Sequence, residues 1–487
     1  MSEARPMSLG YALVPVVALM GLLALNVVVF GDSASYGPNQ IAMLVAGFLA
    51  AAMGVARGVA WHDIAGSIGR TIGSTSEALL ILLLIGALSG TWLIAGIIPA
   101  FIDYGLRALN AEVFLAAACV ICAALSLATG TSWGTVGTVG VALAGIGTAL
   151  GLNPGWVAGA IISGAYFGDK LSPMSDTTNL APAVSGTDLF THIRYMLYTT
   201  MPSLAIALAV FLVAGFGGGA AAEGLGADQW ALADTFGAAV RSKFHIHPGL
   251  FIAPATVIFL IVRKMPAAPA LLIGVLLGAA TAIVFQPHVI RELAGPEATS
   301  FALASYRVAL TAMTTDVAVA TGHPLADELL TAGGMVGMLD TIWLILSAMV
   351  LGGILQATGM LDRITRALLV GVNSAFGLIA RTAGTCLAFN VLASDQYLAI
   401  VVPGNMFREE YARRGLAPEN LSRTLEDSGT VTSVLIPWNT CGVAQSGILG
   451  ISTWTYLPYC IFNWVSPIMS LVVAGLGWKI RKLATTA

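Results

Sequence analysis

Charged side chains are scarce in this sequence of 487 residues. Lys, Arg, Asp and Glu make up 10% of it, whereas hydrophobic residues make up 57%. Soluble domains carry about 25% charged residues, because their surfaces face water. The composition therefore excludes a large soluble core and predicts an integral membrane protein that crosses the bilayer many times. The 55 Gly residues suit the close helix packing of such a protein.

Several chemical signatures are also missing. The five Cys residues include one motif-like pair, Cys119 and Cys122, but no second pair or nearby His completes a metal site. No Gly-rich phosphate motif is present, which argues against ATP-driven transport. HExxH is absent, and no Gly-x-Ser-x-Gly marks a strand-to-helix turn, so the sequence predicts neither an enzyme nor a cofactor. The net charge is −3 and the basic residues are scattered, so nucleic acid is not an expected partner.

Long apolar runs are what the sequence does have. About 20 apolar residues cross the roughly 30 Å hydrocarbon core as a helix. The runs predict 11 to 13 transmembrane segments, several of them short for a full crossing. The first run lacks a convincing cleavage site and is interpreted as a retained span, not a signal peptide. The runs cover 10–30, 41–59, 78–102, 112–127, 136–150, 154–167, 195–216, 251–262, 269–285, 342–355, 376–391, 398–407 and 459–478.

The distribution of basic residues predicts the orientation in the membrane. Cytoplasmic loops are enriched in Lys and Arg. We therefore expect the Arg-rich connections and both termini in the cytoplasm, and segments 31–40, 218–246 and 286–340 outside, where Asp32 and other acidic residues prevail. The basic residues used are Arg57, Arg70, Arg263, Lys264, Arg363, Arg366, Arg408, Arg413, Arg414, Arg423, Lys479, Arg481 and Lys482.

The chain contains an internal repeat with a nearly constant offset. Glu77 and Asp340 each precede a Leu-Ile-Leu run, 263 residues apart, and Pro173 and Pro437 match at 264. Because Glu77 falls on the predicted inner side and Asp340 on the outer side, the two copies are expected to be antiparallel. Inverted repeats with broken helices are typical of secondary transporters. We predict an all-α polytopic membrane protein with broken or re-entrant helices, divided into halves 1–240 and 241–487.

The most polar interruption is GDKLSPMSDTTNLAP, residues 168–182. Pro breaks the helical hydrogen-bond ladder, and desolvating so many polar groups beside membrane spans is unfavourable without a role. Freed carbonyls, hydroxyls, an amide and a carboxylate suit a small hard cation such as Na⁺, with K⁺ not excluded. A polar cytoplasmic loop is the alternative. The expected ligands are Ser175, Asp176, Thr177, Thr178 and Asn179.

The repeat supplies partners for this stretch. IPWNTCG, residues 436–442, lies opposite it and contributes Asn439 and Thr440. A second repeated interruption pairs 129–135, with Thr131 and Ser132, with 393–397, which holds Asp395 between apolar residues. An ionisable group at membrane depth suggests a functional role. A carboxyl near the outer interface is the alternative for this residue.

Other charged residues have less certain roles in the sequence. Asp169 and Lys170 could form an ion pair that holds the first helix break, or a solvated pair of little effect. Asp427, next to Glu426, could bind a cation or face the cytoplasm. Glu77 is interpreted as a helix-cap acid stabilised by the helix dipole, as is Asp340.

The long motif resembles the signature of the NhaC family of Na⁺/H⁺ antiporters, within the ion-transporter superfamily. Residues 129–135 and 433–442 resemble that family too, and the length and two-half organisation extend the resemblance over the whole chain. It implies exchange of cytoplasmic Na⁺ for external H⁺ across a bacterial inner membrane. Some relatives couple Na⁺ and H⁺ to malate and lactate exchange, which leaves an organic-anion antiporter as the alternative.

The resulting hypothesis is alternating access without a cofactor, with Na⁺ and H⁺ as substrates and the lipid bilayer as surroundings. Asp176, with Asp395 as second choice, would bind either H⁺ or Na⁺. A carboxylate that holds one cation at a time couples the two fluxes by competition. The sequence leaves homo-oligomer formation open.

Overall fold

The computed structural model describes residues 7–30, 34, 37–74, 76–108, 111–173, 175–219, 229–263, 265–295, 300–323, 326–327, 330–368 and 374–483. Met174 of the long motif, and Asp32 and Lys264 of the orientation argument, lie outside these residues. Nearly all of the described chain is helical, as predicted. The two short strands, β1 (Val317–Ala318) and β2 (Thr331–Ala332), pair antiparallel with Val317 opposite Ala332.

The N-terminal elements are α1 (Leu9–Phe30), α2 (Pro38–Val55) and α3 (Trp61–Ser74). The first repeat follows as α4 (Ser76–Ile94), α5 (Ile97–Ala108), α6 (Ala111–Thr129), α7 (Ser132–Thr135), the π-helical η2 (Val136–Gly140), α8 (Val141–Ala149), α9 (Pro154–Leu171), α10 (Asp176–Ser185) and α11 (Leu189–Phe216).

The connecting region contains α12 (Gln229–Lys243), η3 (Pro248–Phe251), α13 (Ile252–Val262), α14 (Ala267–Phe285), α15 (Pro287–Ala294), α16 (Phe301–Thr314), the two strands and η4 (Val336–Met338). The second repeat comprises α18 (Leu339–Ala357), α19 (Met360–Leu368), α20 (Ala375–Leu392), α21 (Leu398–Arg413), α22 (Pro418–Leu425), the π-helical η5 (Glu426–Thr430), η6 (Ser433–Leu435), α23 (Thr440–Leu449), α24 (Thr453–Tyr456), η7 (Leu457–Tyr459) and α25 (Ile461–Gly475).

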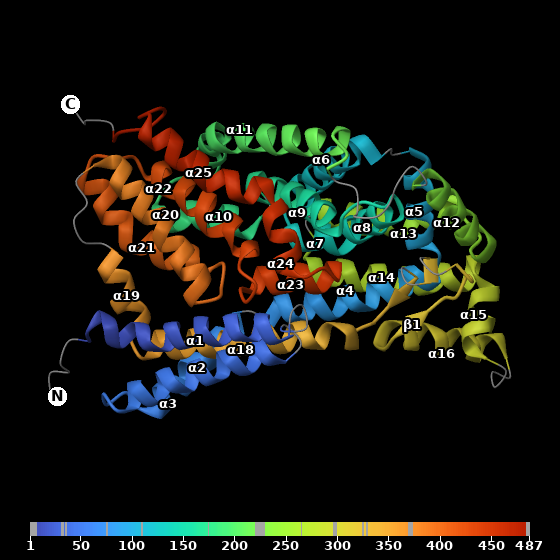
Figure 1. The fold of residues 1–487 in the computed structure, drawn as a ribbon, viewed down its shortest axis with the longest axis horizontal. Coiled ribbons are helices and arrows are strands. Elements are labelled where there is room, and N and C mark those ends of the chain that lie inside the picture. Colours follow the sequence, from blue (N-terminus) through green and yellow to red (C-terminus); the bar gives the residue numbers. More distant parts are fainter. Residues whose placement is uncertain are drawn as a thin grey trace.

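The predicted repeat is visible in the element bounds. The starts of α4 and α18 lie 263 residues apart, and those of α9 and α22, and of α10 and α23, lie 264 apart. Residues with positive φ recur at the same offsets, as at Gly151 (68°) and Gly415 (66°). In Figure 1, α4 leads toward α5 at the right and α18 leads toward α19 at the left, so the copies run in opposite directions. This confirms inverted repeats. The predicted division at 240 falls within α12 and stays a prediction.

Seven helices in the described residues are long and apolar enough to cross a membrane, or up to ten if each of three sharply bent pairs counts as one span. One bent pair is α4 with α5, with an angle of 71° between them. The other predicted spans fall on shorter or interrupted helices such as α8 and α21. The bent pairs and interrupted helices are the broken helices that the sequence predicts.

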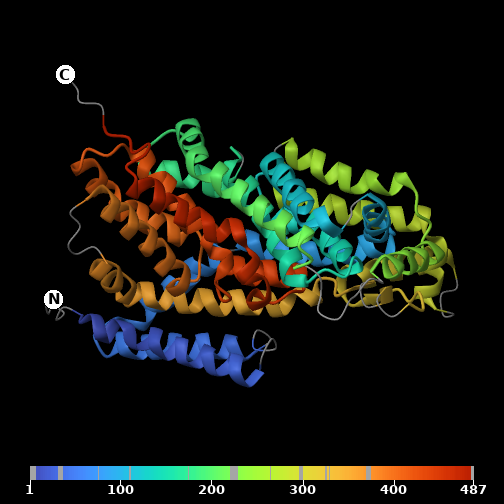
Figure 2. The same cartoon turned by 45° about the horizontal axis from the view of Figure 1, so that its top comes forward.

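The two halves exchange their long helices. Helices α2 and α3 pack on α18 of the second repeat, whereas α14 and α16 pack on α4 of the first. Close approach requires small residues: a Cβ on Gly90 would lie 1.8 Å from the Ala312 carbonyl oxygen. Figure 2 shows α1 and α2 as an outer layer beside α18. The halves are thus interlocked, and α10 of one repeat lies against α21 and α22 of the other.

Candidate functional site

Two helix breaks at repeat-related positions begin the site. Helix α9 ends at Leu171, and after an extended turn Ser175 caps α10 by accepting a hydrogen bond from the Thr178 amide. In the second half Asn439 caps α23 by accepting from the Cys441 amide at 3.0 Å. Side-chain caps satisfy helix-terminal N–H groups that would otherwise be unpaired. Both predicted interruptions are therefore helix N-termini inside the protein.

The second pair of interruptions lies beside them. Helix α6 ends at Thr129, Gly130 has a φ of 72°, and Thr131 caps α7 through the Gly134 amide at 3.1 Å. Ser394, at the equivalent position after α20, has a φ of 58°. A non-glycine residue in this left-handed region carries a strain of about 1–3 kcal/mol, which is found most often at functional sites. Because such strain persists only where the surrounding structure holds the backbone in place, the conformation of 393–397 is set by the fold around it.

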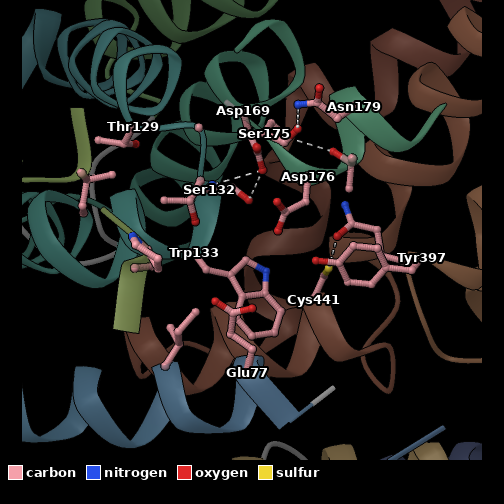
Figure 3. A pocket seen from close by; sticks show the side chains of 18 of the residues that line it. Glu77, Thr129, Ser132, Trp133, Asp169, Ser175, Asp176, Asn179, Tyr397 and Cys441 are labelled. Atoms are coloured by element: carbon pink, nitrogen blue, oxygen red, sulfur yellow. Dashed lines mark hydrogen bonds between the residues drawn. The ribbon is translucent and has the colours of Figure 1, made fainter. Parts of the chain in front are cut away.

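The four interruptions converge on one cavity of about 510 Å³ (Figure 3). Four carboxylates line it, from Glu77, Asp169, Asp176 and Asp395, together with hydroxyl and amide groups and the aromatic rings of Trp133 and Tyr397. None of the described lining residues is Lys, Arg or His; Lys264, beside the lining residue Met265, is outside the described part. The further lining residues are Ile81, Thr129, Gly130, Thr131, Ser132, Pro173, Ser175, Thr177, Asn179, Ile261, Met265, Pro266, Ala267, Gln396, Thr440 and Cys441.

Asp176 projects into this cavity from the first residue of α10 (Figure 3). Its side chain is exposed, as is that of Glu77 at the start of α4, so the cavity is open to solvent. A carboxylate in the first turn of a helix is favoured by the helix dipole, whether or not it also binds a ligand. The Asp176 carboxylate can therefore be reached from solvent.

Asp169 and Asp395 are held more tightly. Asp169 is buried, and its Oδ2 accepts hydrogen bonds from the Ser132 amide at 3.1 Å and the Ser132 hydroxyl at 2.7 Å. Asp395 accepts from the Leu398 amide through Oδ1 at 2.8 Å. Its buried Oδ2 has no hydrogen-bond partner among the described residues. Such an unpaired oxygen in a polar cavity is a natural place for a cation or a proton.

Most of the predicted ligands meet in this cavity, but not all. Thr178 is buried behind it, and its hydroxyl donates to the carbonyl oxygens of Asp169 and Lys170. Asn439 caps α23 and bonds Asn390 at 3.1 Å. Lys170 and Asp427 face each other elsewhere, away from the cavity lining. The residues that do line it are Thr131, Ser132, Ser175, Asp176, Thr177, Asn179, Asp395 and Thr440, with Asp169 among the supporting ones.

Sequence reasoning missed some lining residues. Glu77, interpreted as a cap acid, lies at the start of α4 and also faces the cavity. Gln396 and Tyr397 follow Asp395 directly and line the cavity with it. Their position next to an ionisable residue at membrane depth was the available signal. Cys441 donates to Gln396 Oε1 at 3.2 Å, a contact that no motif indicates.

A second, smaller cavity of about 70 Å³ repeats this construction in the other half. Its lining includes Asp340 and Pro437, the repeat equivalents of Glu77 and Pro173. Pro173 is exposed, whereas Pro437 is buried. The same positions therefore line a large cavity in the first repeat and a much smaller one in the second.

Helices broken at polar residues, paired by an inverted repeat around a hydrophilic cavity, define a membrane transporter of the secondary type. The sequence model of the Na⁺/H⁺ antiporter family matches residues 164–478. The Na⁺/H⁺ antiporter NhaC of Alkalihalophilus pseudofirmus is 35% identical over 443 residues, 91% of each chain. The chain therefore belongs to the Na⁺/H⁺ antiporter family, and the resemblance to NhaC is confirmed.

Other similar proteins have different activities. The malate-2H⁺/Na⁺-lactate antiporter of Bacillus subtilis is 36% identical over 467 residues, 96% of this chain and 94% of that protein. Among solved structures, Neisseria gonorrhoeae MtrF, from a class of antimetabolite efflux pumps, aligns at 13% identity with a TM-score of 0.36, covering 96% of this chain and 95% of its own. Family membership alone therefore does not specify the transported substrate.

Proposed function

We propose that this protein exchanges Na⁺ for H⁺ across the bacterial inner membrane by alternating access. Family membership supports the reaction type. The observation that carries the choice of ion is the cavity with four carboxylates and no described basic residue in its lining. Carboxylate, hydroxyl and carbonyl oxygens are the ligands that hard cations prefer. An anion would meet four carboxylates in the lining of this cavity.

In this proposal, Na⁺ enters by the open cavity and binds at Asp176. Neutral oxygens from Ser175, Thr177 and Asn179 surround it on the first-half side, and Thr440 on the other. Ser132 supports the site by holding Asp169, and Thr131 holds the start of α7. Asp395 supplies a second carboxylate with an unpaired oxygen. Thr178 and Asn439 then act by fixing the helix breaks, without contacting the ion.

The organic-anion alternative has less support from this geometry. A carboxylate substrate needs a cationic or helix-N-terminal clamp, and Lys170 is the cation that the long motif offers. Its ammonium group is fully buried and bonds Asp427 and Ser466 Oγ, the latter at 2.9 Å. It therefore does not line the open cavity.

The proposed orientation puts the open cavity and both termini on the cytoplasmic side. Helices α3, α19 and α22, which carry or adjoin the Arg-rich connections, lie at the left of Figure 1, with the N and C marks. Segments α15 and α16 lie at the right end. Because basic loops stay in the cytoplasm, the left end is assigned to that side.

Everted membrane vesicles test the function. After respiration acidifies the lumen, addition of Na⁺ alone is expected to dissipate the pH gradient, reported by a pH-sensitive dye. Vesicles without the protein provide the control. A response that requires malate or lactate in addition to Na⁺ would replace this proposal with the organic-anion alternative.

A further inference from the structure

A second charged cluster lies outside the cavity and has no part in the binding scheme above. Lys170 from α9 and Asp427 from η5 form an ion pair, and both side chains are fully buried. Thr199 of α11 donates to Asp427 Oδ1 at 3.2 Å, and Ser466 of α25 lies 3.4 Å from the same oxygen. Glu426, also fully buried, is the neighbour of Asp427 on η5. We call Lys170, Glu426, Asp427, Thr199 and Ser466 the buried ion-pair cluster.

The charges of this cluster do not balance. Two carboxylates share one ammonium group, and like charges in a low-dielectric site disfavour full ionisation of both. In the described residues, Glu426 Oε2 and Asp427 Oδ2 have no hydrogen-bond partner. Each of these oxygens can accept a proton without breaking an existing bond. The cluster can therefore gain or lose one proton while its other contacts persist.

Other charged or titratable groups surround the cluster. The buried Arg423 guanidinium stacks on the Tyr195 ring at 4.5 Å and has no described hydrogen-bond partner for its nitrogens. His192 bonds Ser422 at 2.8 Å and lies within electrostatic range of Lys170. Asp169 from α9, His192 from α11 and Cys386 from α20 lie within electrostatic range of the cluster. Arg423 from α22 interacts with Tyr195 of α11 and Tyr411 of α21, and within the described residues it forms no ion pair with a carboxylate of the cluster.

The fold itself does not require this cluster. The repeat equivalent of Asp427, 264 residues earlier, is Ser163, and that of Lys170 is Val434. Both equivalents are also fully buried. The same architecture is thus built without charge in the other copy. Burying an ion pair seldom adds stability over apolar packing, so a role beyond packing is indicated.

One hydroxyl group connects the cluster to the cavity. Thr177 lines the cavity, and its Oγ1 donates to Glu426 Oε1 at 3.0 Å. A hydroxyl both donates and accepts, so it can pass a proton but cannot pass a sodium ion. Glu426 and Asp427 also lie in a π-helical turn, a distortion frequent at functional sites.

We propose that the buried ion-pair cluster holds the transported proton, while Na⁺ binds in the cavity at Asp176. This rests on the proposed Na⁺/H⁺ exchange. A proton from the cavity passes through Thr177 to Glu426 or Asp427, where an O–H bond forms and the cluster gains one positive charge. That charge repels Na⁺ at Asp176, because Thr177, the next residue in the chain, contacts Glu426 directly. Each ion therefore weakens binding of the other without sharing a carboxylate.

The test uses the purified full-length protein in liposomes with two readouts. Counterflow of ²²Na⁺ against Na⁺ at equal pH on both sides requires Na⁺ binding and alternation but no net proton movement. Sodium-driven proton movement, followed with a pH-sensitive dye, requires both ions. In the wild type, competition by one proton should raise the half-saturating Na⁺ concentration by up to about tenfold for each unit by which the pH falls. A wild type without sodium-driven proton movement would refute the exchange proposal itself.

Glu426→Gln and Asp427→Asn are expected to lose proton movement but to keep counterflow, with a half-saturating Na⁺ concentration that no longer changes with pH. Asp176→Asn is expected to lose both activities. If either cluster variant fails to fold, Thr177→Val should lower proton movement more than counterflow, because it removes the hydroxyl that contacts Glu426. Thr177→Ser, which keeps this hydroxyl, should restore the wild-type ratio of proton movement to counterflow. Thr199→Val removes a contact to Asp427 and should alter proton movement. Thr200→Val, on the same helix, is the control and should leave proton movement unchanged. Cluster variants with wild-type proton movement and pH dependence would overturn the inference.

Discussion

At the scale of single residues, Asp176 gives the clearest mutational prediction. Its carboxylate is exposed in the cavity and sits at the first position of α10. Asp176→Asn should therefore abolish Na⁺-dependent exchange in vesicles while leaving expression and thermal stability close to wild type. Glu409→Gln, an exposed carboxylate on α21 outside the cavity lining, is the matched control. Normal exchange in Asp176→Asn would remove this residue from the mechanism.

Asp395 should contribute to affinity more than to the reaction itself. Asn at this position keeps the bond from the Leu398 amide but removes the charge. A carboxylate within about 8 Å of a bound Na⁺ contributes roughly 2 kcal/mol at an effective dielectric constant of about 20. Asp395→Asn is thus expected to raise the half-saturating Na⁺ concentration about thirtyfold, measured by dye response against Na⁺ concentration. An unchanged concentration would place Asp395 outside the ion's reach.

Sequence reasoning located the polar residues of the site better than it assigned their roles. Asp176 and Asp395 were predicted from a helix break and from membrane depth, and the structure places both in one cavity. Thr178 and Asn439 were predicted as ligands, yet their side chains bond the backbone or cap a helix. Capping and ion binding both require side-chain oxygens after a break, so composition alone cannot separate them. Glu77 was missed as a lining residue for the same reason.

At the scale of elements, the contact between α6 and α9 depends on glycine. A Cβ on Gly164 would lie 2.1 Å from the Cys119 carbonyl oxygen, whereas one on Gly384 in α20 would meet no atom within 4 Å. Gly164→Ala should destabilise the protein by about 1–3 kcal/mol through overpacking. Gly384→Ala should be neutral or stabilise by up to about 1 kcal/mol through helix propensity. Thermal unfolding in detergent measures both, and equal melting temperatures would contradict the packing argument.

The repeat offset predicted which elements correspond, because helix breaks leave Pro, Gly and capping residues in the sequence. The starts of α9 and α10 thus recur in α22 and α23. The exchange of long helices between the halves could not be predicted in the same way. The packing of α2 on α18 depends on a small residue facing a large one about 300 positions later, since a Cβ on Gly47 would lie 3.2 Å from Ile354 Cδ1. Helices formed by apolar runs are hydrophobic on every face, so the sequence of a run does not specify which helix it packs against.

At the scale of the whole molecule, the two unequal cavities indicate how the protein would alternate. Asn179 lines the open cavity and is exposed, whereas Val443, 264 residues later, lines the small one and is buried. Because the repeats are inverted, the small cavity would open on the opposite side of the membrane. Asn179→Cys should then react with an impermeant thiol reagent from the cytoplasmic side. Val443→Cys should react from the external side during transport, and labelling of both from one side would contradict the inverted arrangement.

Closure of the small cavity can be tested directly, because its walls touch. A Cβ on Gly447 of α23 would lie 2.2 Å from Thr341 Oγ1 of α18. The pair Thr341→Cys and Gly447→Cys should therefore form a disulfide under oxidation and hold α23 against α18. Transport in proteoliposomes should stop on oxidation and recover on reduction, whereas either single variant should be insensitive. If α23 and α18 separate during alternation, the disulfide blocks the cycle after Na⁺ has bound at the open cavity. Na⁺ binding should then persist, whereas counterflow should be lost. Full transport by the oxidised pair would show that α23 and α18 stay together throughout the cycle.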